Sequence, residues 1–221
     1  MSNAEKSYAV IGKHPLFSGL SDVEAAVSHL SGVWQSYRRG EQLRRREEPF
    51  PSFGLVVRGL IHVSMDDMDG APLLMASVGA GDSFGESLAF LRTRESPVYI
   101  TAAEDSEVLW LSAEPLHSEW EGRDALTAAL SERFSTLLAT RALMQNDRIQ
   151  ILSKPRIRER LTTFFAQCER KYKRRTFCIP FDRASLAVYL GVDRSALSRE
   201  LSRMRAEGHL DFFRSSFRLL P

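Results

Sequence analysis

The stretch Asp182–Glu207 constrains the fold of this 221-residue chain more than any other. It holds two short helical patterns on either side of Gly191, and glycine readily adopts the positive φ at which a helix stops. Asp182 and Asp193 each stand where a carboxylate can accept hydrogen bonds from the free N–H groups of a first helical turn. The stretch therefore predicts two short helices joined by a tight turn.

The apolar residues of these helices mark their buried sides. Leu186, Val188 and Leu190 are expected to face inward on the first helix. On the second, apolar residues recur at spacings of four and three, which is helical periodicity. The side chains expected to point outward from the second helix are Arg194, Ser195, Ser198, Arg199 and Arg203. An arginine at a helix start opposes the helix dipole, which makes sense if that start faces phosphates and base edges.

The charge of the chain is uneven. Its net charge is only +2, but residues 155–221 carry 15 Lys and Arg against 7 Asp and Glu, while residues 1–154 carry 15 against 21. A basic region attached to an acidic body suggests that this region meets a polyanion. A solvated basic face without a partner is the alternative, but the basic excess coincides with the helical pair and so favours nucleic acid.

Between residues 33 and 112 the pattern changes to short β-rich runs separated by glycine turns. Such runs predict an antiparallel roll or sandwich, with hairpin connections at Arg58-Gly59 and Asp69-Gly70. Before them, Ser21 and Glu24 have the spacing of a capping box at the start of a short helix. Together with the helical C-terminal region, the roll makes the predicted fold class α+β.

A long helix is predicted from about residue 125 to the break at Ser153-Lys154-Pro155. Apolar residues recur along it every seven positions, at Leu130, Leu137, Met144 and Ile151. Because such a seam is otherwise exposed, it favours a parallel helix pair and a homodimer, although packing against the roll alone is an alternative. The expected domains are residues 1–120 for the sensing roll, 121–154 for the dimerisation helix and hinge, and 155–221 for the C-terminal domain.

Several classes of function find no support in the sequence. The two cysteines, Cys168 and Cys178, form no C-x-x-C pair, and His62 stands alone on its strand, so neither a metal site nor an iron–sulfur cluster is expected. No nucleophile–base pair or paired acids suggest a catalytic site. No apolar run approaches a membrane span and no signal peptide opens the chain, so we expect a cytoplasmic protein with two free thiols.

Taken in order, these motifs resemble the cyclic AMP receptor protein/FNR family of bacterial transcription regulators. Residues 15–115 resemble the effector domain, with Pro15–Leu20 at its opening and Gly81–Glu86 at the start of its phosphate-binding cassette. Residues 177–220 resemble the winged helix-turn-helix, most specifically over Val192–Leu201. The resemblance implies an N-terminal antiparallel β-roll like a cyclic-nucleotide-binding domain, a long dimerisation helix and a C-terminal winged helix-turn-helix.

The resemblance also implies a dimer that binds double-stranded DNA at an inverted repeat, and it allows a contact with RNA polymerase. Arg194 and Arg199 match arginines that contact DNA in the family, and we expect Arg199 to read a guanine. Ser195 stands where the cyclic AMP receptor protein has a glutamate that reads cytosine, so a different operator is expected. The other DNA-binding residues expected are Asp182, Arg183, Ser198, Arg203 and, at the tip of the wing, Arg214.

The effector pocket departs from the family pattern. Cyclic-AMP-binding members have an Arg-Ser pair that meets the cyclic phosphate, but the matching place here is Ser96-Pro97, which cannot neutralise a phosphodiester. We therefore expect an unknown small-molecule effector other than cyclic AMP, and the absence of an N-terminal cysteine cluster excludes the family's oxygen sensor. The candidate effector-binding residues are Gly85, Glu86, Ser87, Arg94, Ser96, Arg133 and Arg141. A ligand-binding module that acts through a protein partner is the alternative.

Overall fold

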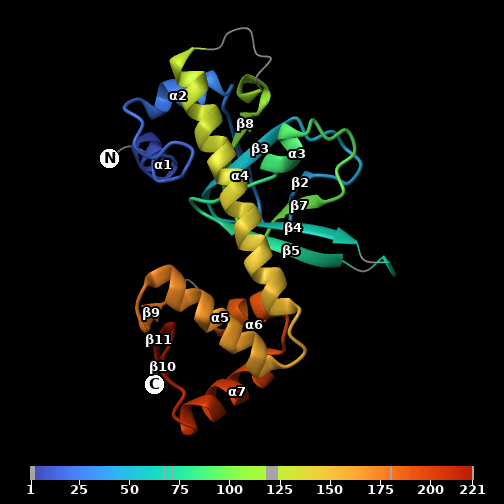
Figure 1. Cartoon of the computed structure of the whole chain (residues 1–221). Coiled ribbons are helices and arrows are strands. Elements are labelled where there is room, and N and C mark those ends of the chain that lie inside the picture. Colours follow the sequence, from blue (N-terminus) through green and yellow to red (C-terminus); the bar gives the residue numbers. More distant parts are fainter. Residues whose placement is uncertain (1–2, 67, 71, 118–123, 180, 221) are drawn as a thin grey trace. The chain divides into compact units, whose positions relative to one another are not determined.

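The computed structural model describes residues 3–66, 68–70, 72–117, 124–179 and 181–220. It divides into two compact units, residues 1–139 and 140–221, each with its own apolar core. The long helix α4 (Ala125–Leu152) is confirmed and contributes one part to each unit (Figure 1).

The first unit is a roll built from two antiparallel four-stranded sheets (Figure 1). One sheet has the strand order β1-β8-β3-β6 and the other β2-β7-β4-β5. The strands are β1 (Val33–Tyr37), β2 (Gln42–Arg44), β3 (Ser52–Arg58), β4 (Leu60–Asp66), β5 (Pro72–Gly79), β6 (Ser83–Phe84), β7 (Tyr99–Ala102) and β8 (Ser106–Ser112). The roll predicted from the short β-rich runs is confirmed.

Helices precede the roll, follow it and lie between two of its strands, β6 and β7. They are α1 (Asn3–Ile11), α2 (Val23–His29), α3 (Glu86–Phe90), a 3-10 turn at Glu114–Leu116 and the first part of α4. The ring of Phe134 on α4 lies 5.4 Å from that of Phe53 on β3, measured between ring centroids. Both rings are almost completely buried, so this part of α4 belongs to the core of the roll.

The seven-residue apolar repeat of α4 is therefore not one exposed seam. Leu130 is buried in the core of the first unit and Ile151 in the core of the second, and both side chains are 0% exposed. Met144, by contrast, is 56% exposed. The expectation that the whole seam needs a partner helix is wrong, because packing within the chain already covers both of its ends.

Two local predictions are also wrong. Arg58-Gly59 joins β3 to β4, which lie in different sheets, so this turn is a crossing between sheets rather than a hairpin. Asp69-Gly70 does lie between two paired strands, β4 and β5. The N-cap of α2 is Asp22, not Ser21, because the Asp22 carboxylate accepts the N–H of Ala25 at 2.9 Å.

The second unit combines helices with a small three-stranded sheet of order β10-β11-β9. Its other elements are α5 (Ile157–Tyr172), β9 (Thr176–Cys178), α6 (Arg183–Leu190), α7 (Arg194–Ala206), β10 (Leu210–Phe213) and β11 (Ser216–Leu219). The ring of Phe165 on α5 lies 5.0 Å from that of Phe217 on β11, which joins the helices to the sheet. The predicted helix pair and the hairpin after it are confirmed.

One expectation for this unit is wrong. Val188 is 58% exposed, whereas Leu186 and Leu190 are 0% exposed. Residues two apart on a helix point in very different directions, so Val188 cannot share a face with both leucines.

Within the residues that the structure covers, no helix has the length and apolar character needed to span a bilayer. The same residues contain no group of three or more His, Cys, Asp or Glu side chains suited to a metal ion. Cys168 and Cys178 are free thiols, and Cys168 is buried while Cys178 is exposed.

Candidate DNA-binding surface and effector segment

The starts of α6 and α7 are each fixed by an aspartate. The Asp182 carboxylate accepts the N–H of Ser185 at 2.7 Å, and this hydrogen bond holds the pKa of Asp182 below its usual value. Gly191 has a φ of 62° and ends α6. The Asp193 carboxylate accepts the N–H groups of Ser195 and Ala196, both at 2.9 Å, and so caps α7. Asp182 and Asp193 are therefore the N-caps of α6 and α7.

The polar residues of α7 share one side of the helix, opposite its buried face. Leu197, Leu201 and Met204 are buried in the core of the unit. Four of the predicted DNA-binding side chains are exposed on the polar side, namely Arg194, Ser195, Arg199 and Arg203. A fifth, Ser198, is half-buried. The structure thus brings together five predicted DNA-binding residues on a single helical surface.

Ser195 holds the side chain of Arg199 in place on this surface. The Ser195 hydroxyl donates to Asp193 Oδ1 at 2.5 Å and accepts from Arg199 Nη1 at 3.1 Å. The hydrogen bond from the Ser195 hydroxyl is the largest cause of the lowered pKa of Asp193. Arg199 is therefore tethered through Ser195 to the cap of α7.

The two remaining arginines of the prediction lie near the hairpin of β10 and β11. The Arg183 guanidinium lies 4.7 Å from the ring centroid of Phe212 and 5.2 Å from that of Phe217, and burial lowers its pKa. Stacking on two rings holds the start of α6 against the sheet. Arg214 is exposed at the tip of the hairpin, with a φ of 52°. Arg214 is thus open to a partner, whereas Arg183 is largely occupied within the unit.

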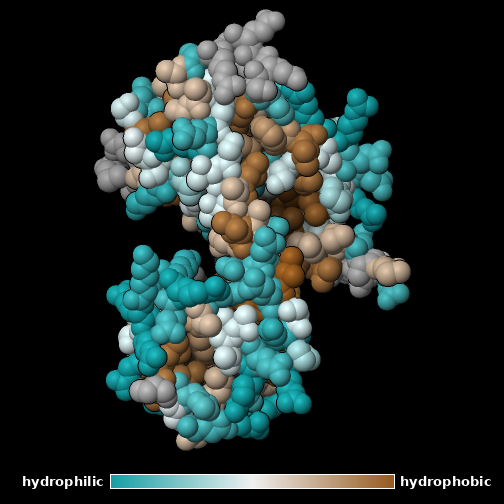
Figure 2. Space-filling model, in the orientation of Figure 1, coloured by the Kyte–Doolittle hydropathy of each residue, from teal (hydrophilic) through white to brown (hydrophobic). Residues whose placement is uncertain are grey.

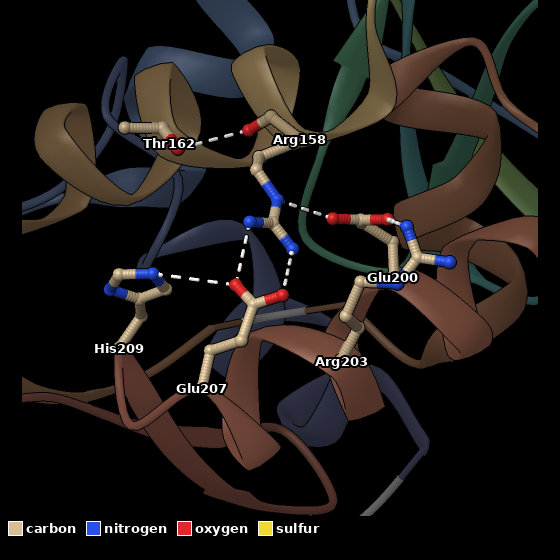
Figure 3. A network of polar contacts seen from close by, with 6 residues as sticks. All are labelled: Arg158, Thr162, Glu200, Arg203, Glu207 and His209. Carbon is tan, nitrogen blue, oxygen red and sulfur yellow. Dashed lines mark hydrogen bonds and ion pairs between the residues drawn. The ribbon is translucent and has the colours of Figure 1, made fainter.

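A network of charged residues behind α7 was not predicted (Figure 3). Arg158, in the first turn of α5, donates from Nε to Glu200 Oε1 at 2.6 Å and from Nη1 and Nη2 to the two oxygens of Glu207 at 2.6 and 3.0 Å. Glu200 also accepts from Arg203 Nη1 at 3.4 Å. His209 Nε2 lies 3.4 Å from Glu207 Oε2. One guanidinium therefore joins two carboxylates that both belong to the α7 segment.

A signal for this network was present in the sequence. Glu200 and Glu207 are seven residues apart, which places them two turns apart on one side of a helix. Arg158 stands in a first helical turn, where a cation opposes the dipole unless carboxylates lie close by. Neither pattern says which residues meet, because that depends on how α5 and α7 pack.

In the roll, most predicted effector residues lie on one segment between β6 and β7. Gly85 has a φ of 79° and precedes α3, and a Cβ added to it would lie 2.2 Å from Cε1 of Phe50. Glu86 is 3% exposed, whereas Ser87 is exposed. The packing of Phe50 thus explains why this position is glycine.

The second part of that segment holds Arg94 and Ser96. Arg94 is exposed, and Ser96 is buried. The Ser96 hydroxyl donates to the carbonyl of Val98 at 2.8 Å, and the Ser96 N–H donates to the carbonyl of Glu48 at 3.0 Å. Ser96 is therefore already engaged by the backbone of the roll.

The other two effector candidates lie on α4. Arg133 donates from Nη1 to the carbonyl of Ser18, within the first unit. Arg141 belongs to the second unit. Of the seven candidates, five therefore share the segment between β6 and β7, and Arg133 is bound to the N-terminal part of the chain.

Two family models cover most of this architecture. Residues 34–121 match the cyclic nucleotide-binding domain, and residues 159–220 match the Crp-like helix-turn-helix domain. The chain belongs to the cyclic AMP receptor protein/FNR (Crp/Fnr) family. It is a Crp-like transcription regulator with an effector-binding domain and a helix-turn-helix DNA-binding domain.

Solved structures of other regulators share this fold. The chain is similar to the catabolite activator protein of Thermus thermophilus, with 24% identity, 93% of each chain covered and a TM-score of 0.52. It is similar to FixK2 from Bradyrhizobium japonicum, with 24% identity, 85% of this chain and 92% of that chain covered and a TM-score of 0.54. It is also similar to the c-di-GMP responsive regulator CLP of Xanthomonas campestris, with 17% identity, 90% of this chain and 100% of that chain covered and a TM-score of 0.58. The sequence matches none of the curated proteins.

Within the Crp/Fnr fold, α7 is the second helix of the helix-turn-helix, and β10 and β11 form the wing. Gly81–Glu86, which resembles the start of the family's cassette, contains β6 and leads into α3. The chain therefore has the parts of a sensor and of a DNA reader, each held by the contacts described above.

Proposed function

We propose that the protein is a dimeric, sequence-specific DNA-binding regulator that acts in the cytoplasm and responds to a small molecule other than cyclic AMP. The observation that carries the proposal is the exposed side of α7, where Arg194 and Arg199 follow the capped turn. The start of a recognition helix enters the major groove, where an arginine can pair with O6 and N7 of guanine. The exposure of Arg214 at the tip of the wing supports a further contact with the DNA backbone.

Exposed apolar residues on α4 support the dimer. Leu143, Met144 and Ile149 are 67%, 56% and 63% exposed. Apolar side chains reach the surface along α4 in Figure 2. A long helix that leaves apolar side chains such as those of the neighbours Leu143 and Met144 exposed is suited to pairing with a second copy of itself. Two copies present two α7 helices, which suits an inverted repeat with half-sites about one DNA turn apart.

The contacts of Ser96 support an effector other than cyclic AMP. Its hydroxyl is bound to the backbone of Val98, and the next residue, Pro97, has no N–H to donate. Neither residue can therefore meet a cyclic phosphate as an arginine does. The related CLP is described as c-di-GMP responsive, which supports a roll of this kind serving different ligands.

The test begins with selection of a preferred sequence from a random DNA pool by the wild-type protein. Arg199→Ala is then compared with Arg170→Ala, a matched loss of an exposed arginine on the last turn of α5. We expect Arg199→Ala to lose about 1–3 kcal/mol of discrimination at one base pair of each half-site. Arg170→Ala should keep the discrimination of the wild type.

Circular dichroism should show that both variants are folded. If folded Arg199→Ala keeps the base preference of the wild type, Arg199 does not read DNA. Salt dependence separates the main proposal from the alternative of a ligand-binding module that acts through a protein partner. Each phosphate contact releases counterions, so DNA binding should give a plot of log K against log[salt] with a slope of about −0.9 for each contact. If the wild-type protein selects no DNA sequence and shows no such salt dependence, the alternative of a module that acts through a protein partner is favoured.

A further inference from the structure

Arg158 links α5 to two separate places on the recognition helix. Glu200 directly follows Arg199 in the middle of α7, and Glu207 is the C-cap of the same helix. In Figure 3 the guanidinium of Arg158 lies between the two carboxylates. The Glu200 side chain is only 14% exposed, and those of Arg158 and Glu207 are 39% and 38% exposed. The contact is thus partly shielded from solvent.

The geometry of this contact is directional. Arg158 uses Nε for one carboxylate and both terminal nitrogens for the other, and the planar fork of a guanidinium fixes the angle between them. Leu197 and Leu201 keep the apolar face of α7 in the core, and Arg205 pairs with Asp211 at 2.8 Å near the end of the helix. The fork adds directional contacts from α5, one in the middle of α7 and one at its end, and these oppose rotation of α7 about its own axis.

The charges of the network bear on the outward side of the helix as well. Arg158 draws both carboxylates toward α5, and its hydrogen bonds are the main cause of the lowered pKa of Glu207. Arg203 is 66% exposed and lies at 3.4 Å from Glu200, a longer contact than the 2.6 Å of Arg158. Arg158 binds Oε1 of Glu200 and Arg203 binds Oε2, so Glu200 joins the inner contact to an arginine on the outer surface.

We propose that Arg158 is a positioning residue for base recognition, which sets the rotation of α7 and thereby the direction in which Arg199 points. The proposal rests on the proposed function as a DNA reader. Arg158 does not itself need to touch DNA, because its guanidinium is occupied by Glu200 and Glu207. Its loss should therefore weaken the choice between bases without removing a phosphate contact.

The test uses Arg158→Met in the full-length protein, with Arg156→Met as the matched control on an exposed neighbour. The quantity measured is the ratio of affinities for the selected sequence and for a version with one base pair changed. We expect Arg158→Met to lower this ratio about tenfold, as for the loss of a hydrogen bond to a charged group, and Arg156→Met to leave it unchanged. An unchanged ratio in Arg158→Met would overturn the proposal.

Salt dependence distinguishes positioning from direct contact. The slope of log K against log[salt] should be the same in Arg158→Met and in Arg156→Met, because neither change removes a phosphate contact from the positioned helix. A slope smaller by about 0.9 in Arg158→Met alone would mean that Arg158 touches a phosphate, and would overturn the proposal.

Two further variants separate position from charge. Arg158→Lys keeps the charge but loses the fork, so we expect its discrimination to stay impaired. The triple variant Arg158→Met/Glu200→Gln/Glu207→Gln removes the two carboxylates that Arg158 neutralises. If either variant regains the discrimination of the wild type, the role of Arg158 is charge compensation, and positioning is wrong.

A measurement without DNA keeps the inference separate from the proposed function. Amide hydrogen exchange should be faster over the middle and end of α7 in Arg158→Met and Arg158→Lys than in the wild type and in Arg156→Met. If the wild type selects no DNA sequence, the proposed function fails, while faster exchange still supports the clamp on α7. Equal exchange in all four proteins would overturn the clamp itself.

Discussion

Gly85 is the position in the roll where a single methyl group has the clearest consequence. Its φ of 79° is left-handed, and a Cβ placed there would lie 2.2 Å from Cε1 and 2.6 Å from Cζ of Phe50. Phe50 is 1% exposed and so has no solvent-filled space to move into. We predict that Gly85→Ala destabilises the first unit through both backbone strain and overlap with this ring.

The two contributions have separate magnitudes. A left-handed alanine costs about 1–2 kcal/mol relative to glycine. Carbon atoms in contact prefer about 3.5–4.0 Å, so the Phe50 ring must shift by more than about 1 Å, and overpacking of this kind costs about 1–3 kcal/mol. Gly85→Ala should therefore cost about 2–5 kcal/mol in the free energy of unfolding.

A double-mutant cycle with Phe50→Ala tests the origin of this cost. Phe50→Ala alone should cost about 3–5 kcal/mol, because it leaves a cavity in the core. In the double variant the methyl group added at position 85 enters space that the ring has left, so the overlap disappears while the backbone strain remains. We expect the cost of the double variant to fall about 1–3 kcal/mol below the sum of the single costs.

Tryptophan fluorescence during urea unfolding reports on the correct unit, because Trp34, Trp110 and Trp120 all lie within residues 1–139. Gly79→Ala is the matched control, since a Cβ at Gly79 meets nothing within 4 Å, and its effect should stay within about 0.5 kcal/mol. Strictly additive costs for Gly85→Ala and Phe50→Ala would refute the overlap. A cost for Gly85→Ala as small as that of the control would refute the strain as well.

Two further predictions concern the ligand and the thiols. Cyclic AMP at millimolar concentration should leave the unfolding temperature followed by tryptophan fluorescence unchanged, whereas a ligand present at 100 times its Kd adds about 2.7 kcal/mol; a rise of several degrees would contradict our account of Ser96-Pro97. Burial raises the pKa of Cys168 to about 11, so at pH 8 this thiol is protonated as well as shielded. A thiol reagent at pH 8 should therefore modify exposed Cys178 quickly and Cys168 only on unfolding, and equal rates would contradict the packing of α5.

The parts of the site that could be predicted from sequence are those set by neighbouring residues. Asp182 and Asp193 cap helices that start one residue later, and Gly191 ends a helix that precedes it directly. Such contacts span two to four residues, so the right residue types at the right spacing are enough to predict them. The antiparallel roll was predictable for a similar reason, because short β-rich runs between glycines leave few alternatives.

The predictions that failed depend on contacts between distant segments. Arg58-Gly59 has the composition of a hairpin turn, but β3 finds its partners in β6 and β8 instead of β4. The seven-residue repeat of α4 has the period of a coiled coil, but Leu130 and Ile151 serve two cores within the chain. In each case tertiary packing decided against the structure that the local pattern favoured.

Ser195 shows how one position can change what a recognition helix reads. A glutamate at this place, as in the cyclic AMP receptor protein, accepts a hydrogen bond from cytosine. A serine side chain is shorter than that of glutamate, and here its hydroxyl is engaged by Asp193 and Arg199. We infer that Ser195 supports the arginine one turn on and does not itself read a cytosine. The operator should then be recognised mainly through guanines facing Arg199 and Arg194. Because that support and the fork of Arg158 act on the same helix, the direction of Arg199 is set from both its outer and its inner side.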